Sequence, residues 1–112
     1  MYSQVFSRLH VSGSGSAEYS QAVQVGEANA AQMDLVVYAI TGSSATLTIQ
    51  LQESNDLENW KDKGSASTAT AIGYTLGSLT TSISSSYVRM KISITGTTPS
   101  SVVAAGISVS RQ

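Results

Sequence analysis

The side chains that most often perform catalysis are scarce in this chain of 112 residues. It has one histidine, His10, and no cysteine, so thiolate nucleophiles, disulfides and thiolate metal sites are excluded. No acidic residue stands beside His10, and no serine lies in a Gly-x-Ser-x-Gly sequence between a strand and a helix. We therefore expect no catalytic residues and no enzymatic activity, and we interpret His10 as an exposed or interface residue of a strand.

The best candidate for a metal site is a short run of oxygen-bearing side chains around a predicted turn. Glu53, Asn55, Asp56 and Glu58 carry the kind of donor that calcium prefers. They lack the Asp-x-Asp-x-Asp-Gly spacing of a calcium loop, and asparagine and aspartate form turns by accepting hydrogen bonds from nearby backbone amides. We therefore predict no metal site and no cofactor.

Trp60, the single tryptophan, follows this turn and permits two interpretations. Its ring can stack on a sugar, in which case Asn55, Asp56 and Trp60 would bind a glycan. It can instead pack over the hairpin, because an indole buries a large apolar area. The second interpretation is favoured, since the tyrosines that would complete a sugar platform are dispersed in the sequence.

The pattern of apolar residues predicts the elements that hold these side chains. Apolar and polar residues alternate along much of the chain, as in strands with one buried face. Residues 33–41 are apolar on both faces, which is typical of a central strand covered on both sides. Strand patterns recur at residues 2–11, 19–25, 33–41, 45–53, 69–76, 79–83, 86–95 and 101–110. The chain is therefore predicted to be all-β, a single-domain antiparallel β-sandwich or jelly roll of about eight short strands with little or no helix.

Glycine- and serine-rich segments predict the joints between strands. This pattern predicts turns at residues 41–44 and 96–99. Residues 1–11 form a predicted N-terminal strand or arm, residues 12–16 a flexible Gly/Ser joint, and residues 17–112 the β-sandwich domain.

The flexible joint at residues 12–16 would allow the N-terminal arm to extend away from its own domain. Five residues span at most about 17 Å, which is enough to carry the arm to a neighbouring subunit and pair it with an exposed sheet edge. We therefore predict a subunit interface formed by Tyr2, Val5, Phe6 and Leu9. The alternative is an ordinary hairpin within one chain.

Charge and hydropathy restrict the partners. Charged residues make up 12% of the chain and the net charge is −1, so self-repulsion is weak and association is favoured. The basic residues are scattered, which argues against nucleic-acid binding. The sequence has neither an apolar run long enough for a membrane helix nor the features of a signal peptide.

Residues 52–60 carry the most distinctive motif, Gln-Glu-Ser-Asn-Asp-Leu-Glu-Asn-Trp. It resembles a β-hairpin, typically Glu-Ser-x-Asp-Gly-x-x-Trp, found in virion structural proteins of tailed bacteriophages and in carbohydrate-binding discoidin-like sandwiches. Leu57 stands where glycine is usual. The turn is therefore expected to avoid the left-handed conformation at Leu57, or to place it at Asn55 or Asp56.

The resemblance implies a structural role in an assembly. The leading hypothesis is a self-assembling coat, decoration or tail subunit, located in a virion or assembling in the cytoplasm. Its partners would be copies of itself and other virion proteins. The alternative is a carbohydrate- or surface-binding module that uses Trp60 to hold a glycan.

Overall fold

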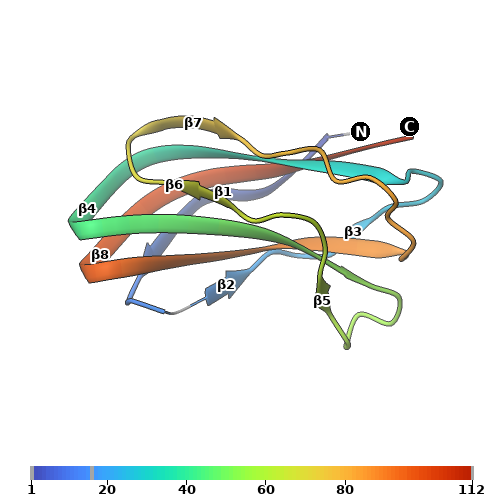
Figure 1. Ribbon diagram of the computed structural model, residues 1–112, viewed down its shortest axis with the longest axis horizontal. Coiled ribbons are helices and arrows are strands. Elements are labelled where there is room, and N and C mark those ends of the chain that lie inside the picture. Colours follow the sequence, from blue (N-terminus) through green and yellow to red (C-terminus); the bar gives the residue numbers. More distant parts are fainter. Residues whose placement is uncertain (1, 16, 112) are drawn as a thin grey trace.

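The computed structural model describes residues 2–15 and 17–111, which form strands and connecting loops without a helix. In this part of the chain no helix is present that would be long and apolar enough to span a membrane. The all-β prediction is confirmed (Figure 1). The strands are β1 (Tyr2–Ser12), β2 (Ala17–Tyr19), β3 (Val23–Gln24), β4 (Ala30–Ser54), β5 (Lys61–Asp62), β6 (Ser67–Ala69), β7 (Gly73–Leu76) and β8 (Tyr87–Ser110).

Two long antiparallel strands form the centre of a single 8-stranded sheet. β4 and β8 pair along nearly their whole length, from Ala30 opposite Ser110 to Ser54 opposite Tyr87. At one half of this ladder, β1 adds to β8 and β7 adds to β4. At the other half, β2 and β3 add to β8, while β5 and β6 add to β4. Every other strand therefore borders one of the two central strands.

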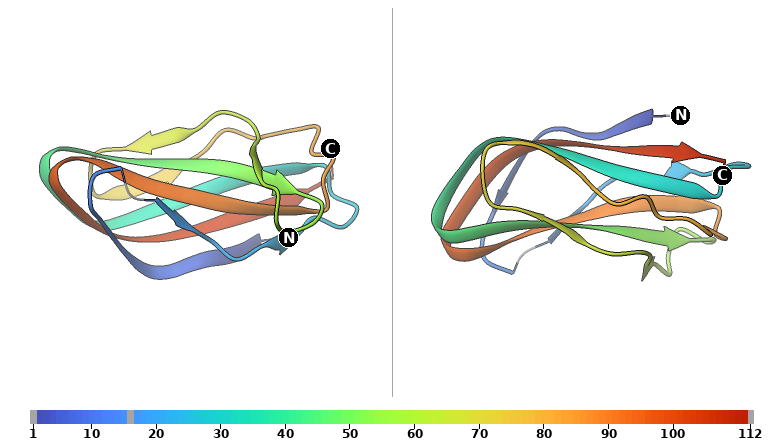
Figure 2. Two further views of the ribbon diagram at one scale, coloured as in Figure 1. Left: turned by 90° about the horizontal axis from the view of Figure 1, so that it is seen from below. Right: turned by 45° about the horizontal axis from the view of Figure 1, so that its top comes forward.

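Both central strands bend sharply at the same place, which is the feature that shapes the molecule (Figure 2). The bend contains Gly42, with φ of 113°, and Gly96, with φ of 132°. The turns predicted at residues 41–44 and 96–99 are therefore wrong, because both strands continue through these segments. The glycines mark a change of direction, but the two strands bend together and keep their ladder, with register shifts between Thr41 and Thr46.

The bend brings the two halves of the sheet face to face, and the core lies between them (Figure 2). Alternate residues of each strand point inward, as the pleat of a strand requires. Leu47, Ile49 and Leu51 supply one half, and Leu35 and Ile107 the other, all at 0–1% exposure. A sandwich or jelly roll consists of two separate sheets, whereas here all the strands belong to one continuous sheet. The predicted sandwich or jelly-roll arrangement therefore stays a prediction.

Other sequence-based expectations differ from the structure in detail. The predicted strand at residues 19–25 is divided between β2 and β3, and the one at residues 79–83 is reduced to a single bridge between Ala31 and Thr80. Residues 33–41 were expected to be covered on both faces. Their inward face is buried, but on the outward face Val36 is half-buried and Tyr38 is 47% exposed, so this prediction is wrong within one chain.

Candidate functional site

The loop between β4 and β5 is held by two short side chains. The Ser54 hydroxyl accepts hydrogen bonds from the backbone N–H groups of Asp56 at 3.2 Å and Leu57 at 3.1 Å. It donates in turn to Oδ1 of Asp56 at 2.9 Å. That same oxygen accepts the N–H groups of Glu58 at 3.0 Å and Asn59 at 2.8 Å, and Oδ2 accepts from the Asn59 amide at 2.7 Å. The carboxylate of Asp56 thus organises the loop from within.

Leu57 corrects the expectation for this turn. Its φ is +65°, so it adopts the left-handed conformation itself, and Asn55 and Asp56 do not. A branched side chain in this region costs on the order of 1–2 kcal/mol. The bonds to Ser54 and Asp56 on either side determine the backbone strongly enough to offset that cost.

These bonds make the stability of the loop depend on pH. Hydrogen bonds from the backbone of Asn59, then of Glu58, hold the pKa of the Asp56 carboxyl well below its usual range. A depressed pKa in the folded state contributes stability above the ordinary pKa, and this stability is lost as pH falls towards the lower value. We expect Asp56→Ala to lower Tm by several degrees at pH 7, and by progressively less below about pH 4.

Thermal unfolding followed by circular dichroism at pH 7, 4 and 2.5 would measure this difference. Glu58→Ala is the control, because Glu58 lies in the same exposed loop and enters the hydrogen bonds through its backbone alone. A Tm difference for Asp56→Ala that stays constant across the series would contradict the assigned role.

Trp60 packs against an arginine on the outer face of the sheet. The guanidinium of Arg89 lies 4.3 Å from the ring centre of Trp60 and 4.3 Å from that of Tyr19. Burial lowers the pKa of Arg89, which stays charged at neutral pH. Its Nε donates to Gln52 at 2.8 Å, and the Trp60 indole N–H donates to the Leu57 carbonyl at 3.2 Å. The indole therefore contacts Arg89 of β8, while the choice between a packing role and a ligand-binding role for Trp60 stays a prediction.

A pocket of about 280 Å³ is lined by residues of this loop. The loop lies at the end of the sheet opposite the bend (Figure 1). The predicted ligand-binding residues Asn55, Asp56 and Trp60 all line it. Their role in binding stays a prediction, and Asp56 is occupied by loop amides. The complete lining is Glu53, Ser54, Asn55, Asp56, Asn59, Trp60, Lys61 and Ser85.

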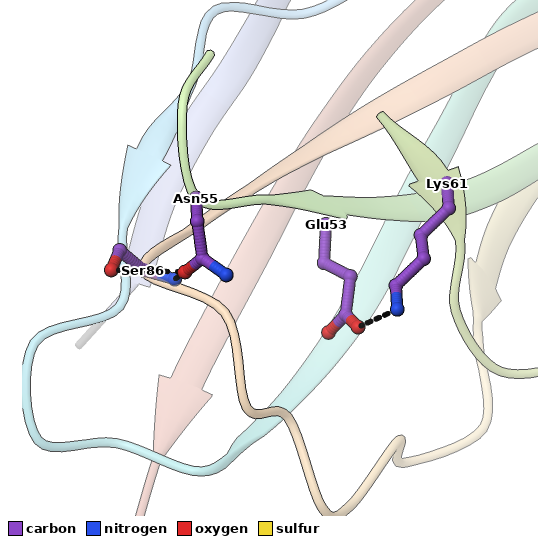
Figure 3. A network of polar contacts seen from close by, with 4 residues as sticks. All are labelled: Glu53, Asn55, Lys61 and Ser86. Carbon is purple, nitrogen blue, oxygen red and sulfur yellow. Dashed lines mark hydrogen bonds and ion pairs between the residues drawn. The ribbon is translucent and has the colours of Figure 1, made fainter. Parts of the chain in front are cut away.

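Glu53 is the unexpected member of the pocket. It is 1% exposed, and its Oε1 lies 3.8 Å from the Nζ of Lys61 (Figure 3). Its Oε2 is buried without a hydrogen-bond partner among the residues that the structure describes. The sequence contains a signal for this burial, because Glu53 continues the inward-facing series of Leu47, Ile49 and Leu51.

Val5, Phe6 and Leu9, predicted to dock on another copy, are partly buried against the chain's own core, and β1 pairs with its own β8. β1 thus pairs within the chain, but with β8 and not in a hairpin with β2, while exchange between copies stays a prediction. Met1, Ser16 and Gln112, which belong to the predicted arm, joint and domain, lie outside the described residues.

Tyr2, the fourth predicted interface residue, is 55% exposed. Its ring lies over Gly106, where any side chain would collide with it, and its hydroxyl donates to Asp34 at 3.1 Å.

His10 is hydrogen-bonded to the Ser100 hydroxyl at 2.7 Å, and no hydrogen bond joins it to a carboxylate within the described chain. In residues 2–15 and 17–111, no three His, Asp or Glu side chains are grouped to hold a metal ion. Glu58 lies in the exposed loop and does not join Glu53 in such a group.

No protein-family model matches the chain, and no curated protein matches it in sequence. The fold does resemble solved structures. The PBSX exported protein XepA superposes with a TM-score of 0.71 at 14% identity, over 100% of this chain and 37% of XepA. PirA superposes with a TM-score of 0.59 at 13% identity, over 96% of this chain and 94% of PirA. The chain thus spans little more than a third of XepA, and at these identities the likeness shows the fold alone.

Proposed function

We propose that this chain is a structural subunit of a phage-type particle and associates with copies of itself. The observation that carries the proposal is an apolar outer face on the β1–β8–β4–β7 half of the sheet, here called the tyrosine face. Pairing of Val36 with Tyr74 and of Asp34 with Leu76 places these residues on one side of the sheet. The tyrosine face comprises Tyr2, Val36, Tyr38, Tyr74 and Leu76 around Asp34.

The tyrosine face exposes four large apolar or aromatic side chains. Tyr2 is 55% exposed, Tyr38 47%, Tyr74 61% and Leu76 57%. Monomeric proteins rarely expose contiguous apolar patches above a few hundred Å², and tyrosine is enriched at protein interfaces. The low content of charge, 12%, weakens repulsion between copies.

Polar contacts hold the rings of this face in place. The two oxygens of Asp34 accept the hydroxyls of Tyr2 at 3.1 Å and Tyr74 at 3.3 Å. Burial and the nearby Asp34 carboxylate raise the pKa of both tyrosines, so both hydroxyls stay protonated at neutral pH. Arg8 lies 5.0 Å from the ring centre of Tyr38. Rings fixed before contact lose less side-chain entropy when a partner binds, which favours association.

The particle type rests on two further lines of support. The hairpin at residues 52–60 resembles one found in virion structural proteins of tailed bacteriophages. The fold likeness to a PBSX exported protein fits a role outside the producing cell. We also propose that the folded sheet is a variant of the expected β-sandwich, in which bent strands join the two layers.

Light scattering after size exclusion tests the proposal. We expect the natural chain to form a defined oligomer or larger particle, and Leu76→Lys to shift it towards the 11.6 kDa monomer. A lysine within an apolar contact must be desolvated, which disfavours association. Leu57→Lys is the matched control, since Leu57 is 49% exposed on the β4–β5 loop, away from the tyrosine face. A natural chain that stays monomeric at high concentration would overturn self-association.

A further inference from the structure

Strand β7 lies at an open edge of the sheet, along the outer side of β4 (Figure 1). In the described part of the chain, β4 is the only strand that pairs with β7. The N–H of Gly77 donates to the carbonyl of Met33 at 2.8 Å, and successive residues of an antiparallel strand direct their backbone groups alternately to its two sides. The groups of Thr75 therefore face β4, while the N–H and C=O groups of Tyr74 and Leu76 face the open edge. Such an edge is a template for another strand.

This edge lacks the features by which proteins usually prevent strand pairing, which are charged side chains, prolines and bulges. Residues 64–86, which contain β6 and β7, have no charged residue and no proline. The pairing of β7 with β4 shows no register shift. The two residues whose backbone faces the edge, Tyr74 and Leu76, also expose large apolar side chains. Low charge and the absence of proline are typical of segments that add to another strand.

The other edge strands of the described chain are protected or polar. β1 has two register shifts against β8 and carries Arg8. β2 is only three residues long and contains Glu18, and β5 consists of Lys61 and Asp62. β6 is uncharged, but its exposed side chain is the polar Thr68. Pairing β7 with β1, β2 or β5 would place a charge beside an apolar strand, whereas a second β7 matches it in both charge and side chains.

We propose that β7 pairs with β7 of a second copy in antiparallel orientation, which joins the two sheets into one across a two-fold axis. This inference rests on the proposed self-association and specifies one of its contacts. With the axis beside Thr75, Tyr74 of each copy lies opposite Leu76 of the partner subunit, and each such pair exchanges both of its backbone hydrogen bonds. Residues that lie opposite each other share a face, so the two tyrosine faces become one continuous surface.

The edge contact and the tyrosine face have different roles in assembly. A two-fold contact uses the same patch on both copies and closes at a dimer, so a larger particle needs a second interface. Pairing at the edge of β7 leaves the joined tyrosine faces uncovered. Each dimer would therefore keep an apolar surface through which it can associate further.

Amide hydrogen exchange of the natural chain tests the pairing without any substitution. Light scattering locates the concentration at which the chain associates, and exchange is then measured below and above it by mass spectrometry. We expect the amides of Tyr74 and Leu76 to exchange about tenfold more slowly at a concentration ten times above the midpoint, because they exchange only from the dissociated form. The amides of β6, an edge strand in the same uncharged segment, serve as the control and should not change. Unchanged exchange at β7 in an associated chain would overturn the edge pairing and leave self-association standing, whereas a chain that is monomeric at every concentration would overturn both.

A single cysteine identifies the partner strand, because the natural chain has no cysteine. Paired β7 strands would hold the two Cα atoms of residue 75 about 4.5 Å apart, within the range of about 4.4–6.8 Å that a disulfide requires. Under mild oxidation we expect Thr75→Cys to form a linked dimer at least about tenfold faster than Thr68→Cys, the control on β6, because thiols held opposite each other react at a high effective concentration. Slow exchange at β7 without faster linking of Thr75→Cys would mean that a different strand occupies the edge, which would overturn the proposal.

Discussion

Alanine at Gly42 or Gly96 is expected to lower the free energy of unfolding by about 2–4 kcal/mol. Both glycines have φ values, 113° and 132°, that side chains rarely adopt. A Cβ at Gly42 would also lie 2.9 Å from the Cα of Pro99, and one at Gly96 would lie 2.9 Å from the carbonyl oxygen of Ser43. Each long strand thus blocks the space beside the glycine of the other, and neither backbone can move without opening the bend.

Gly73→Ala separates the two causes of this loss. Gly73 has a φ of 139°, but nothing lies within 4 Å of a Cβ added there. Gly73→Ala therefore introduces backbone strain without a steric collision. It should lower the free energy of unfolding by less than Gly42→Ala or Gly96→Ala. Urea denaturation of the three variants measures the difference. If Gly42→Ala were no less stable than Gly73→Ala, the close approach of the two strands would not be what fixes the bend.

Ile49→Ala is the second substitution with a large expected effect, a loss of about 2–5 kcal/mol. Ile49 is 0% exposed and lies opposite Ile92, also 0% exposed, at the centre of the half that carries the pocket. Truncation removes buried methyl groups and leaves a cavity that the continuous ladder prevents from closing. Domains of this size are stable by only about 5–15 kcal/mol, so the loss is a large fraction of the total.

Thr48→Ala is the matched control for this change. Thr48 is the preceding residue of β4, points to the opposite face and is only half-buried. Thr48→Ala should lower the free energy of unfolding by less than about 1 kcal/mol, which is the range over which residue types differ in strand propensity. Equal losses for Thr48 and Ile49 in urea denaturation would show that the inward face is not the packed one.

Alternation of apolar residues was sufficient to predict the class of the fold and the inward face of the long strands. It predicted correctly that Leu47, Ile49 and Leu51 face the core. The turn predictions made from glycine and serine failed at Gly42 and Gly96, because the same residues that reverse a chain also allow it to bend. Which of the two occurs depends on the partner strand: here β4 and β8 bend in step and retain their pairing, which no local pattern reveals.

The candidate site could be predicted only in part. The motif at residues 52–60 brought Asn55, Asp56 and Trp60 to attention, and all three line the pocket. The burial of Glu53 follows from the alternation of β4, once a charged residue is allowed to occupy an inward position. The contact of Arg89 with Tyr19 and Trp60 was not predictable, because the three residues lie on separate elements that only the sheet order brings together.

The shared central strands also make the pairing of this sheet long-range in sequence. At one end of the β4–β8 ladder, next to the segment 55–86 that connects the two strands, Ser54 lies opposite Tyr87. At the other end Ala30 lies opposite Ser110. Every pair of this ladder joins residues on either side of the segment 55–86, so none of the pairing is local in sequence. Sheets dominated by such distant pairings fold slowly, on the order of milliseconds to seconds. Strand β1 pairs with β8 and strand β7 with β4, so both edges of the tyrosine face are built on the two strands of this long-range ladder.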